Sequence, residues 1–469
     1  MNVIAESGMK VVSGSFRDPS GQVFLTPGAA LRSIQSGYAA HWEAATASGF
    51  LSEAVEKGLL IGFEEVDPME GAWKTLRSPL LPFVSYPYEW SFGQLRDAAL
   101  CTLDVLDCAL QHGLSLKDAT GYNVQYVGAK PVFIDLLSFE VRHAGQPWVG
   151  YLQFCRHFLA PLALMAKKSV LCGRMLYCWI EGIPLDLAVS LLPWITKFSP
   201  TLGIHLHMHA KMQAKYADAR SAASKLKNLK MSDDSVKSLS QSLRMAVEGL
   251  NLPAGLKTEW GDYYTDTNYS EVAANDKREY LENVARVHAR GGIAVDLGAN
   301  RGVFSRFLAQ WYDYVVAADV DYVAVERLYR ELKSEEVGNV FPMVLDLGNP
   351  SPGIGWGHTE RLPFADRCNA SYLSALALIH HLVFTAGIPV FKIEEYFFSI
   401  LNEGGICVLE FVPREDSQVQ RLLAAREGVF DDYSLEVCVG VFSRRFDILD
   451  VHSVADSCRS VIVMQKRAL

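Results

Sequence analysis

Three aspartates in the C-terminal part of the chain have the surroundings of ligand-binding carboxylates. Asp296, Asp319 and Asp346 each directly follow a run of apolar residues. A carboxylate about 20 residues beyond a glycine turn is well placed to accept hydrogen bonds from both hydroxyls of a ribose. We therefore predict that Asp319 binds the ribose of an adenosine and that Asp346 accepts from its adenine amino group. Taken singly, each aspartate is also explained as a helix cap or a turn residue.

A turn with two glycines follows the first of these aspartates. Gly298 and Gly302 flank Asn300, and an apolar run that predicts a helix comes next. Glycine lets the backbone approach a ligand closely because it has no side chain. A strand, a glycine turn and a helix place backbone N–H groups at the carboxyl end of the strand, where open α/β sheets bind ligands. We predict a cofactor site formed by Asp296, Gly298, Asn300 and Gly302.

The segment 296–302, Asp-Leu-Gly-Ala-Asn-Arg-Gly, resembles the first motif of class I S-adenosylmethionine methyltransferases. Asp319 matches the ribose-binding acid of that family and Asp346 its adenine-side acid. The resemblance implies S-adenosylmethionine as cofactor, a Rossmann-like seven-stranded sheet, and Asp296 and Gly298 near the methionyl end. The GxGxxG pattern of dinucleotide-binding enzymes is absent, which disfavours an NAD enzyme.

Nearly the whole chain also resembles a bacterial family related to a host-specific nodulation protein. Its members pair an N-terminal region with a C-terminal methyltransferase. The segments that carry this similarity are 16–21, 86–90, 115–118, 375–382 and 410–413. The similarity implies a class of reaction and leaves the methyl acceptor open.

Candidate catalytic residues follow the next two predicted strands, 370–378 and 405–410. His380 and His381 come after the first, where a neutral imidazole suits the removal of a proton from a hydroxyl acceptor. Glu410 ends the second. The alternatives are a packing or capping role for the histidines and a loop-fixing role for Glu410. Four aromatic residues before the glycine turn form either a lid or a packing cluster: Trp260, Tyr263, Tyr264 and Tyr269.

The N-terminal half contains a second polar pattern. Asp118 and Asn123 are five residues apart, and Asp135 closes the apolar run 131–134. This is the layout of a kinase catalytic loop, in which the first Asp positions a hydroxyl and the other two residues hold magnesium. The region thus resembles a degenerate protein-kinase-like fold, since the glycine-rich loop is missing and Leu136 follows Asp135. Whether these residues bind nucleotide and magnesium is left open.

The elements that position these residues divide the chain into three parts. An N-terminal α+β domain, 1–200, comes first. A helical connector, 201–254, is lysine-rich and is predicted to be solvated. The α/β methyltransferase domain, 255–469, alternates strands and helices. Within the connector, the alternating His205, His207 and His209 are explained more simply as an exposed polar strip than as metal ligands, so no metal site is predicted.

Composition limits the classes of partner. The 469 residues are 50% hydrophobic and carry a net charge of −9, which disfavours a nucleic-acid partner. The apolar stretches are short and interrupted by prolines, so no membrane span is predicted. Nine scattered cysteines without a CxxC pair suggest reduced thiols and a cytoplasmic protein.

The most direct interpretation is methyl transfer from S-adenosylmethionine to a small-molecule or glycan acceptor. No Asn-Pro-Pro-Tyr-like run follows the fourth strand, which disfavours the exocyclic amino group of a nucleobase as methyl acceptor. A hydroxyl or carboxylate of a sugar, glycolipid or small metabolite therefore fits best. Two alternatives are a bifunctional kinase–methyltransferase and a non-catalytic scaffold that binds the cofactor.

Overall fold

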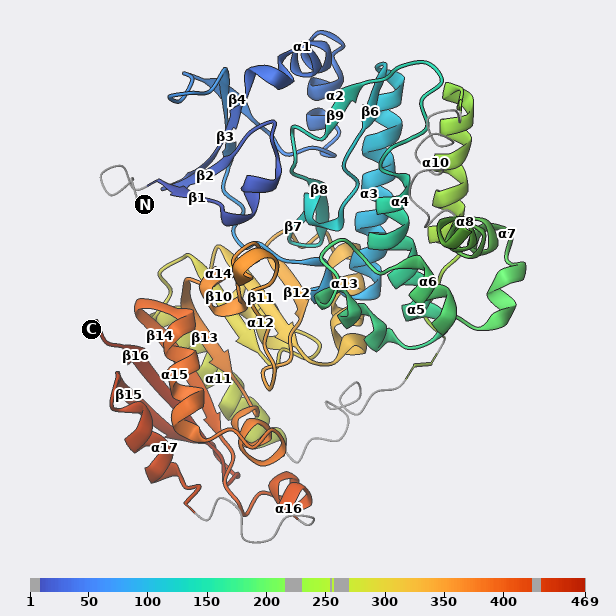
Figure 1. Ribbon diagram of the computed structural model, residues 1–469. Coiled ribbons are helices and arrows are strands. Elements are labelled where there is room, and N and C mark those ends of the chain that lie inside the picture. The colour runs from blue at the N-terminus through green and yellow to red at the C-terminus, as the bar shows by residue number, and fades with distance from the viewer. Residues whose placement is uncertain (1–8, 216–229, 254, 257–269, 424–431, 469) are drawn as a thin grey trace. The chain divides into compact units, whose positions relative to one another are not determined.

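The chain folds into two compact units in the computed structural model, which describes residues 9–215, 230–253, 255–256, 270–423 and 432–468 (Figure 1). Unit 1 comprises Met1–Leu256 and Gly353–Arg361. Unit 2 comprises Lys257–Pro352 and Leu362–Leu469.

A seven-stranded mixed sheet forms the centre of unit 2, in the order β12-β11-β10-β13-β14-β16-β15. Its strands are β10 (Ile293–Leu297), β11 (Tyr314–Asp319), β12 (Val340–Val344), β13 (Ala370–Ala375), β14 (Leu401–Phe411), β15 (Phe446–Ser453) and β16 (Ser460–Lys466). Neighbours from β12 to β14 are parallel, whereas β16 is antiparallel to β14 and β15. The predicted seven-stranded α/β sheet is confirmed.

The order of the strands reverses beside β10. The chain runs from β10 to β11 and β12 on one side and returns to β13 on the other side. All residues of β11 and β12 are buried, as expected for parallel strands covered on both faces. Ligands of open α/β sheets bind at such a reversal, at the carboxyl ends of the strands. The carboxyl ends of β10 and β13 are therefore the expected position of a ligand site.

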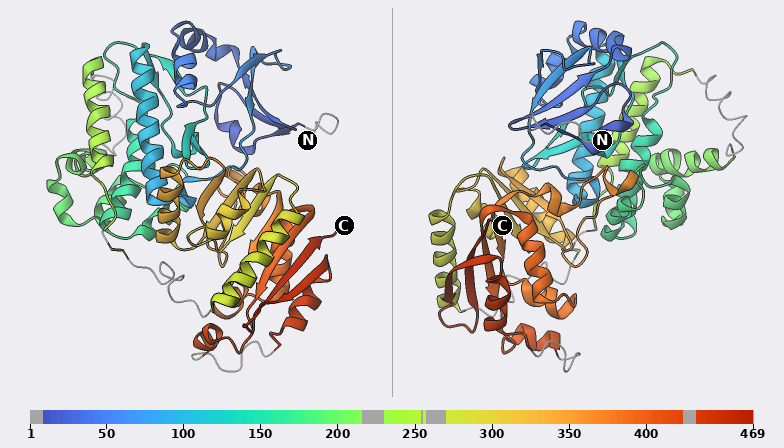
Figure 2. Two further views of the ribbon diagram at one scale, coloured as in Figure 1. Left: turned by 180° about the vertical axis from the view of Figure 1, so that it is seen from behind. Right: turned by 60° about the vertical axis from the view of Figure 1, so that its left-hand side comes forward.

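Helices cover both faces of this sheet, with α11 on one face and α15 on the other (Figure 2). The helices of unit 2 are α11 (Glu271–Val287), α12 (Val303–Leu308), α13 (Tyr322–Ser334), α14 (Phe364–Arg367), α15 (Val390–Ile400), α16 (Ser417–Leu423) and α17 (Leu435–Phe442). The fourth strand is shorter than predicted. It ends at Ala375 because the next residues turn, with Ala377 in a left-handed conformation. His380 therefore lies at the start of a helical turn rather than at a strand end.

Unit 1 begins with a five-stranded antiparallel sheet in the order β1-β2-β3-β5-β4. The strands are β1 (Lys10–Val11), β2 (Val23–Thr26), β3 (Ala29–Ile34), β4 (Glu64–Val66) and β5 (Lys74–Pro79), and helices α1 (Ala39–Ala47) and α2 (Phe50–Glu56) connect β3 to β4. The unit is α+β, as predicted. Its likeness to a kinase remains a prediction.

Helix α3 (Phe92–Gln111), the longest that the structure describes in unit 1, starts where the sequence dictates. Ser91 caps it by accepting from the N–H of Gln94 at 3.4 Å, and Gln94 Oε1 accepts from the N–H of Ser91 at 2.8 Å. This capping box satisfies two backbone donors that a helix start would otherwise leave free. Leucines at helical spacing then bury one face of α3.

The rest of unit 1, where the structure describes it, contains two strand pairs and further helices. The pairs are β6 (Leu114–Leu116) with β9 (Phe139–Val141) and β7 (Val124–Val127) with β8 (Lys130–Phe133). The helices are α4 (Tyr151–Phe154), α5 (Ala160–Lys167), α6 (Leu185–Leu191), α7 (Pro200–Leu202), α8 (His209–Lys215) and α10 (Asp233–Glu248).

The stretch predicted as a solvated connector is packed where the structure describes it. Helix α10 lies against α3: Ser240 Oγ donates to Asp107 at 2.7 Å and Arg244 pairs with Asp104 at 2.6 Å. Leu243 on the same helix is fully buried. The description as solvated is wrong for α10, because its apolar face packs within unit 1. The boundaries 1–200, 201–254 and 255–469 remain a proposal.

The histidines of this stretch are not an exposed strip either. His205 and His207 are 1% and 7% exposed. His205 bonds Tyr151 Oη and Ser242 Oγ, both at 2.8 Å, and His207 bonds Thr196 Oγ1 at 2.8 Å. Burial is tolerated because the ring nitrogens find hydrogen-bond partners.

Candidate active site

The glycine turn after β10 adopts a backbone that most residues avoid. Gly298, Asn300 and Gly302 have φ of 78°, 48° and 69°, in the left-handed region. The N–H groups of Gly298 and Ala299 both donate to the carbonyl of Ala318, at 2.8 and 3.1 Å. The turn is therefore held against the end of β11, with glycine at two of the three left-handed positions, where a side chain would add strain.

Asp296 organises the elements around this turn. It is 3% exposed. Its carboxylate accepts from Ser305 Oγ on α12 at 2.6 Å and from Ser374 Oγ on β13 at 2.7 Å. Burial raises the pKa of Asp296, and the two serine hydrogen bonds oppose that rise. Asp296 thus links α12 to β13, the strand on the other side of the reversal.

Asp319 lies at the end of the neighbouring strand, with both oxygens oriented by backbone. The N–H of Asn300 donates to Oδ2 at 2.7 Å and that of Asp321 to Oδ1 at 2.8 Å. Burial raises the pKa of Asp319 to about 6, and the charges of Asp321 and Asp296 add to the rise. Each oxygen accepts one of these bonds and keeps acceptor capacity for a hydroxyl.

The third predicted acid, Asp346, lies two residues beyond β12. It is half-buried, and its Oδ1 accepts from the N–H of Gly348 at 2.9 Å. The N–H of Leu345 donates to the carbonyl of Asp319 at 2.8 Å, which keeps this turn beside β11. The structure thus brings the glycine turn, Asp319 and Asp346 to one edge of the sheet.

Glu410 is the centre of a buried ionic network. It is fully buried near the end of β14, and its oxygens pair with Lys277 Nζ of α11 and with Arg459 Nη1 at 3.2 Å. Arg459, 3% exposed, also pairs with Asp416 at 2.8 Å. Two cations and two anions thus compensate one another, as buried charges require.

The two candidate histidines lie near this network, with ring centroids 4.1 Å apart. His380 is 1% exposed, and its Nδ1 has no hydrogen-bond partner among the residues that the structure describes. Burial lowers the pKa of His380 well below its usual value, and the charges of His381 and Arg459 lower it further. Burial likewise lowers the pKa of His381, to about 4. Both imidazoles are therefore neutral at pH 7.

The kinase-like trio of unit 1 is also brought together. Asn123 Nδ2 donates to the backbone carbonyl of Asp118 at 3.4 Å and to Ser138 Oγ at 3.2 Å, and Ser138 in turn donates to Asp135. Burial and the charge of Asp135 raise the pKa of Asp118. Arg32 pairs with Asp135 at 2.8 Å, so a cation already lies beside this carboxylate.

Sequence reasoning missed several residues of the site in unit 2. The ionic network is completed by Lys277, Arg459 and Asp416. The first two are far from Glu410 in the sequence, and the third belongs to no recognisable motif. The two serines on Asp296 were missed for the same reason. Asp321 had a local signal, because Asp two residues after a strand-ending Asp and before an apolar helix is a typical N-cap; its side chain accepts from the N–H groups of Val323 and Ala324.

Two other expectations concern the aromatic residues before the glycine turn and the absence of a membrane span. The aromatic residues Trp260, Tyr263, Tyr264 and Tyr269 lie outside the described residues. Among the helices that the structure describes, none combines the length and the apolar character needed to cross a bilayer.

Solved structures with similar folds cover the C-terminal part of the chain. N-methyltransferase NodS from Bradyrhizobium japonicum WM9 in complex with S-adenosyl-L-homocysteine covers 44% of this chain and 93% of its own, at 12% identity and a TM-score of 0.34. Magnesium protoporphyrin IX methyltransferase (ChlM) from Synechocystis PCC 6803, with the same molecule bound, covers 45% and 92%, at 15% identity and a TM-score of 0.31. Such scores and identities assign no activity to the chain.

The sequence comparison covers more of the chain than the comparison with solved structures. No protein-family model matches the chain. The nodulation protein NoeA of Rhizobium meliloti (strain 1021), however, is 33% identical over 468 residues, which are 97% of this chain and 96% of that protein. Similarity at this level over nearly the full length of both chains shows common descent, and the protein therefore belongs to the family of the nodulation protein NoeA.

Proposed function

We propose that the chain is an S-adenosylmethionine-dependent methyltransferase with its cofactor site in unit 2. The observation that carries the proposal is the set of carboxylates at or just beyond the ends of three adjacent parallel strands, beside the reversal of strand order. The proposed cofactor-binding residues are Asp296, Gly298, Asn300, Gly302, Asp319 and Asp346.

The donors and acceptors present fit an adenosine-containing cofactor. Asp319 is ionised above pH about 6 and keeps acceptor capacity for the two ribose hydroxyls. The left-handed Gly298 leaves the backbone of the turn free of a side chain at the strand end. Asp346, half-buried just beyond the next strand, is suited to accept from an amino group.

In the proposed mechanism the bound cofactor supplies a methyl group on a positively charged sulfur. The residues of the chain orient the acceptor and take its proton. His380 Nδ1, neutral and without a partner among the described residues, is the proposed proton acceptor for a hydroxyl. A carboxylate acceptor needs no such base, and His380 then has only a packing role.

We assign Glu410 a positioning role rather than that of a base. Its oxygens are engaged by Lys277 and Arg459, and its side chain is fully buried. It thus orients the end of β14 beside His380, whose pKa its charge raises. His381 remains an alternative base, and burial lowers its pKa to about 4.

The proposed acceptor is a hydroxyl or carboxylate on a sugar, glycolipid or other small metabolite. The name of the relative supports a role in nodulation. A cytoplasmic location remains part of the proposal.

Calorimetric titration of S-adenosylhomocysteine into the full-length protein tests the cofactor site. We expect one-to-one binding that Asp319→Ala abolishes, because the variant loses the proposed ribose acceptor. Asp447→Ala is the matched control, since Asp447 lies on edge strand β15 in an exposed pair with Arg467. Absence of binding to the folded wild-type protein would refute the proposal.

A second candidate function is phosphotransfer by unit 1, so that the chain would be bifunctional. It is favoured by the hydrogen bonds that join Asn123 and Asp135 to Ser138, and Asn123 to the backbone carbonyl of Asp118. Magnesium-dependent ATP binding that Asp135→Ala removes would support it. A non-catalytic scaffold, the other alternative, predicts cofactor binding with no methylated product formed in extracts that contain the acceptor.

A further inference from the structure

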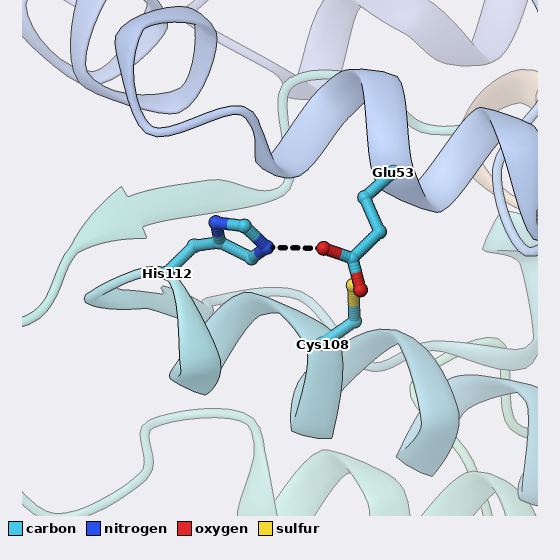
Figure 3. Close-up of side chains that lie close together, drawn as sticks. All are labelled: Glu53, Cys108 and His112. Atoms are coloured by element: carbon cyan, nitrogen blue, oxygen red, sulfur yellow. Dashed lines mark hydrogen bonds and ion pairs between the residues drawn. The ribbon is translucent and has the colours of Figure 1, made fainter.

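Three side chains of different chemistry meet between α2 and α3 in unit 1. Glu53 of α2, Cys108 of α3 and His112 at the end of α3 each offer one metal-binding atom, and these atoms lie within 4.8 Å of one another (Figure 3). Cys108 and His112 are four residues apart, which places them on the same face of the helix. Glu53 reaches this face from the neighbouring helix.

The imidazole of His112 is oriented in the way that metal-binding histidines are. Its Nδ1 lies 2.8 Å from the backbone carbonyl of Ser48, so Nδ1 carries a proton and donates it. Its Nε2 faces Glu53 Oε2 at 2.8 Å. Metal-bound histidines commonly donate their other ring N–H to a carbonyl, which fixes the ring and directs the second nitrogen to the ion.

The surroundings offer access and partial charge compensation. Cys108, together with Asp104 and Asp107, lines a cavity of about 320 Å³ through which an ion can reach the thiol. Lys57 pairs with Glu53 Oε1 and leaves Oε2 directed at His112. The lysine opposes a cation, whereas the thiolate and the carboxylate favour one.

We propose that Glu53, Cys108 and His112 bind a divalent ion of the zinc class through Oε2, Sγ and Nε2. Sulfur and imidazole ligands select zinc-like ions over magnesium or calcium. Tetrahedral zinc at about 2.0–2.3 Å from its ligands places them about 3.3–3.8 Å apart. The Nε2–Oε2 contact of 2.8 Å must therefore open, and any pair near the 4.8 Å limit must close. Three protein ligands leave a fourth position for water from the cavity. With Nδ1 protonated, the contact to Glu53 means that Nε2 also carries a proton, so binding breaks this contact and releases the Nε2 proton and the thiol proton of Cys108 to solvent.

Cobalt(II) titration of the full-length protein tests this site, because a cobalt–thiolate bond gives a near-ultraviolet charge-transfer band. We expect the band to appear at one equivalent and to disappear when zinc is added. Cys108→Ser should remove the band, and His112→Ala should weaken zinc binding by about tenfold or more in competition with a chromophoric chelator. Cys101→Ser, a buried cysteine earlier on the same helix, is the control and should bind like the wild type.

Three outcomes would overturn the proposal. One is a wild-type protein that gives no thiolate band with cobalt. Another is saturable zinc binding that Cys108→Ser and His112→Ala leave unchanged, which would mean binding at exposed acidic groups elsewhere. The last is an equal loss in Cys101→Ser, which would mean that thiols bind metal without this geometry. Circular dichroism of each variant ensures that a lost band is not a lost fold.

Discussion

Burial and hydrogen bonds act in opposite directions on the pKa of Asp319. Burial raises the pKa, the hydrogen bonds from backbone N–H groups lower it, and the effect of burial is the larger. A pKa raised from 3.8 to about 6 means that the folded protein binds a proton more tightly than the unfolded chain. The free energy of unfolding must then fall as pH rises through this window, by about 2–3 kcal/mol. This cost is the price of a carboxylate that is ready to accept ribose hydroxyls at neutral pH.

We predict that Asp319→Asn removes this dependence on pH. Urea unfolding between pH 4 and 7 should show the wild type losing stability relative to the variant as the pH rises. S-adenosylhomocysteine binding by the wild type should weaken as the pH falls below about 6, because the protonated carboxyl is the poorer acceptor. An unchanged difference between wild type and variant across this range would show that Asp319 titrates normally.

Arg459 compensates two buried carboxylates, and its removal leaves them short of a cation. We predict that Arg459→Met lowers the free energy of unfolding by about 3–5 kcal/mol, measured by urea unfolding at pH 7. Arg467→Met is the control, because the Arg467–Asp447 pair is exposed and should contribute less than about 1 kcal/mol. Equal effects of the two substitutions would contradict the assignment of a buried network.

At the scale of elements, the glycine turn and helix α12 depend on Gly302. Its φ of 69° disfavours other residues, and a Cβ there would lie 2.7 Å from Leu328 Cδ1. We predict that Gly302→Ala costs about 1–3 kcal/mol in thermal unfolding and weakens cofactor binding.

A glycine inside a helix provides the comparison. Gly440 lies in α17, exposed, with open space where a Cβ would be added. Gly440→Ala should therefore stabilise the protein by about 0.5–1 kcal/mol, since alanine is the better helix former. If both substitutions stabilised the protein, the turn at Gly302 would not have the backbone described.

At the scale of the whole molecule, unit 1 includes a segment that the chain supplies from the middle of its C-terminal half, Gly353–Arg361. Glu360 of this segment is 3% exposed and accepts from Arg17 Nε and Nη2, both at 2.8 Å, and from the N–H of Trp356 at 2.7 Å. The stability of unit 1 thus depends on residues far along the chain.

We predict that Glu360→Ala destabilises unit 1 by about 1–3 kcal/mol, because it removes a buried acceptor from several donors. Scanning calorimetry with and without S-adenosylhomocysteine should separate the units, since ligand raises the transition of the unit that binds it. The variant should lower the other transition. Glu181→Ala, whose exposed carboxylate lies 4.0 Å from Arg17, should leave both unchanged. A shift confined to the ligand-sensitive transition would contradict this assignment.

The sequence by itself determined the framework of unit 2. Apolar runs that end in Asp296, Asp319 and Asp346 are local signals, and each corresponds to a strand or its immediate end. Parallel pairing then brings such ends to one edge of the sheet, so the candidate cofactor residues were predictable together. The capped helix α3 was predictable for the same reason, because its start and its periodicity lie within 20 residues or so.

Only the tertiary structure decided what surrounds those residues. The partners of Glu410 come from a helix 133 residues earlier and from the residue just before β16, 49 residues later, and no local pattern links them. The burial of His205 and the packing of α10 were also invisible, because a polar residue is buried wherever distant partners satisfy it. The proposed metal cluster likewise joins an unremarkable pair on α3 to a glutamate of α2. Short-range periodicity specifies elements, whereas charge compensation and hydrogen bonding are settled between residues that only folding brings together.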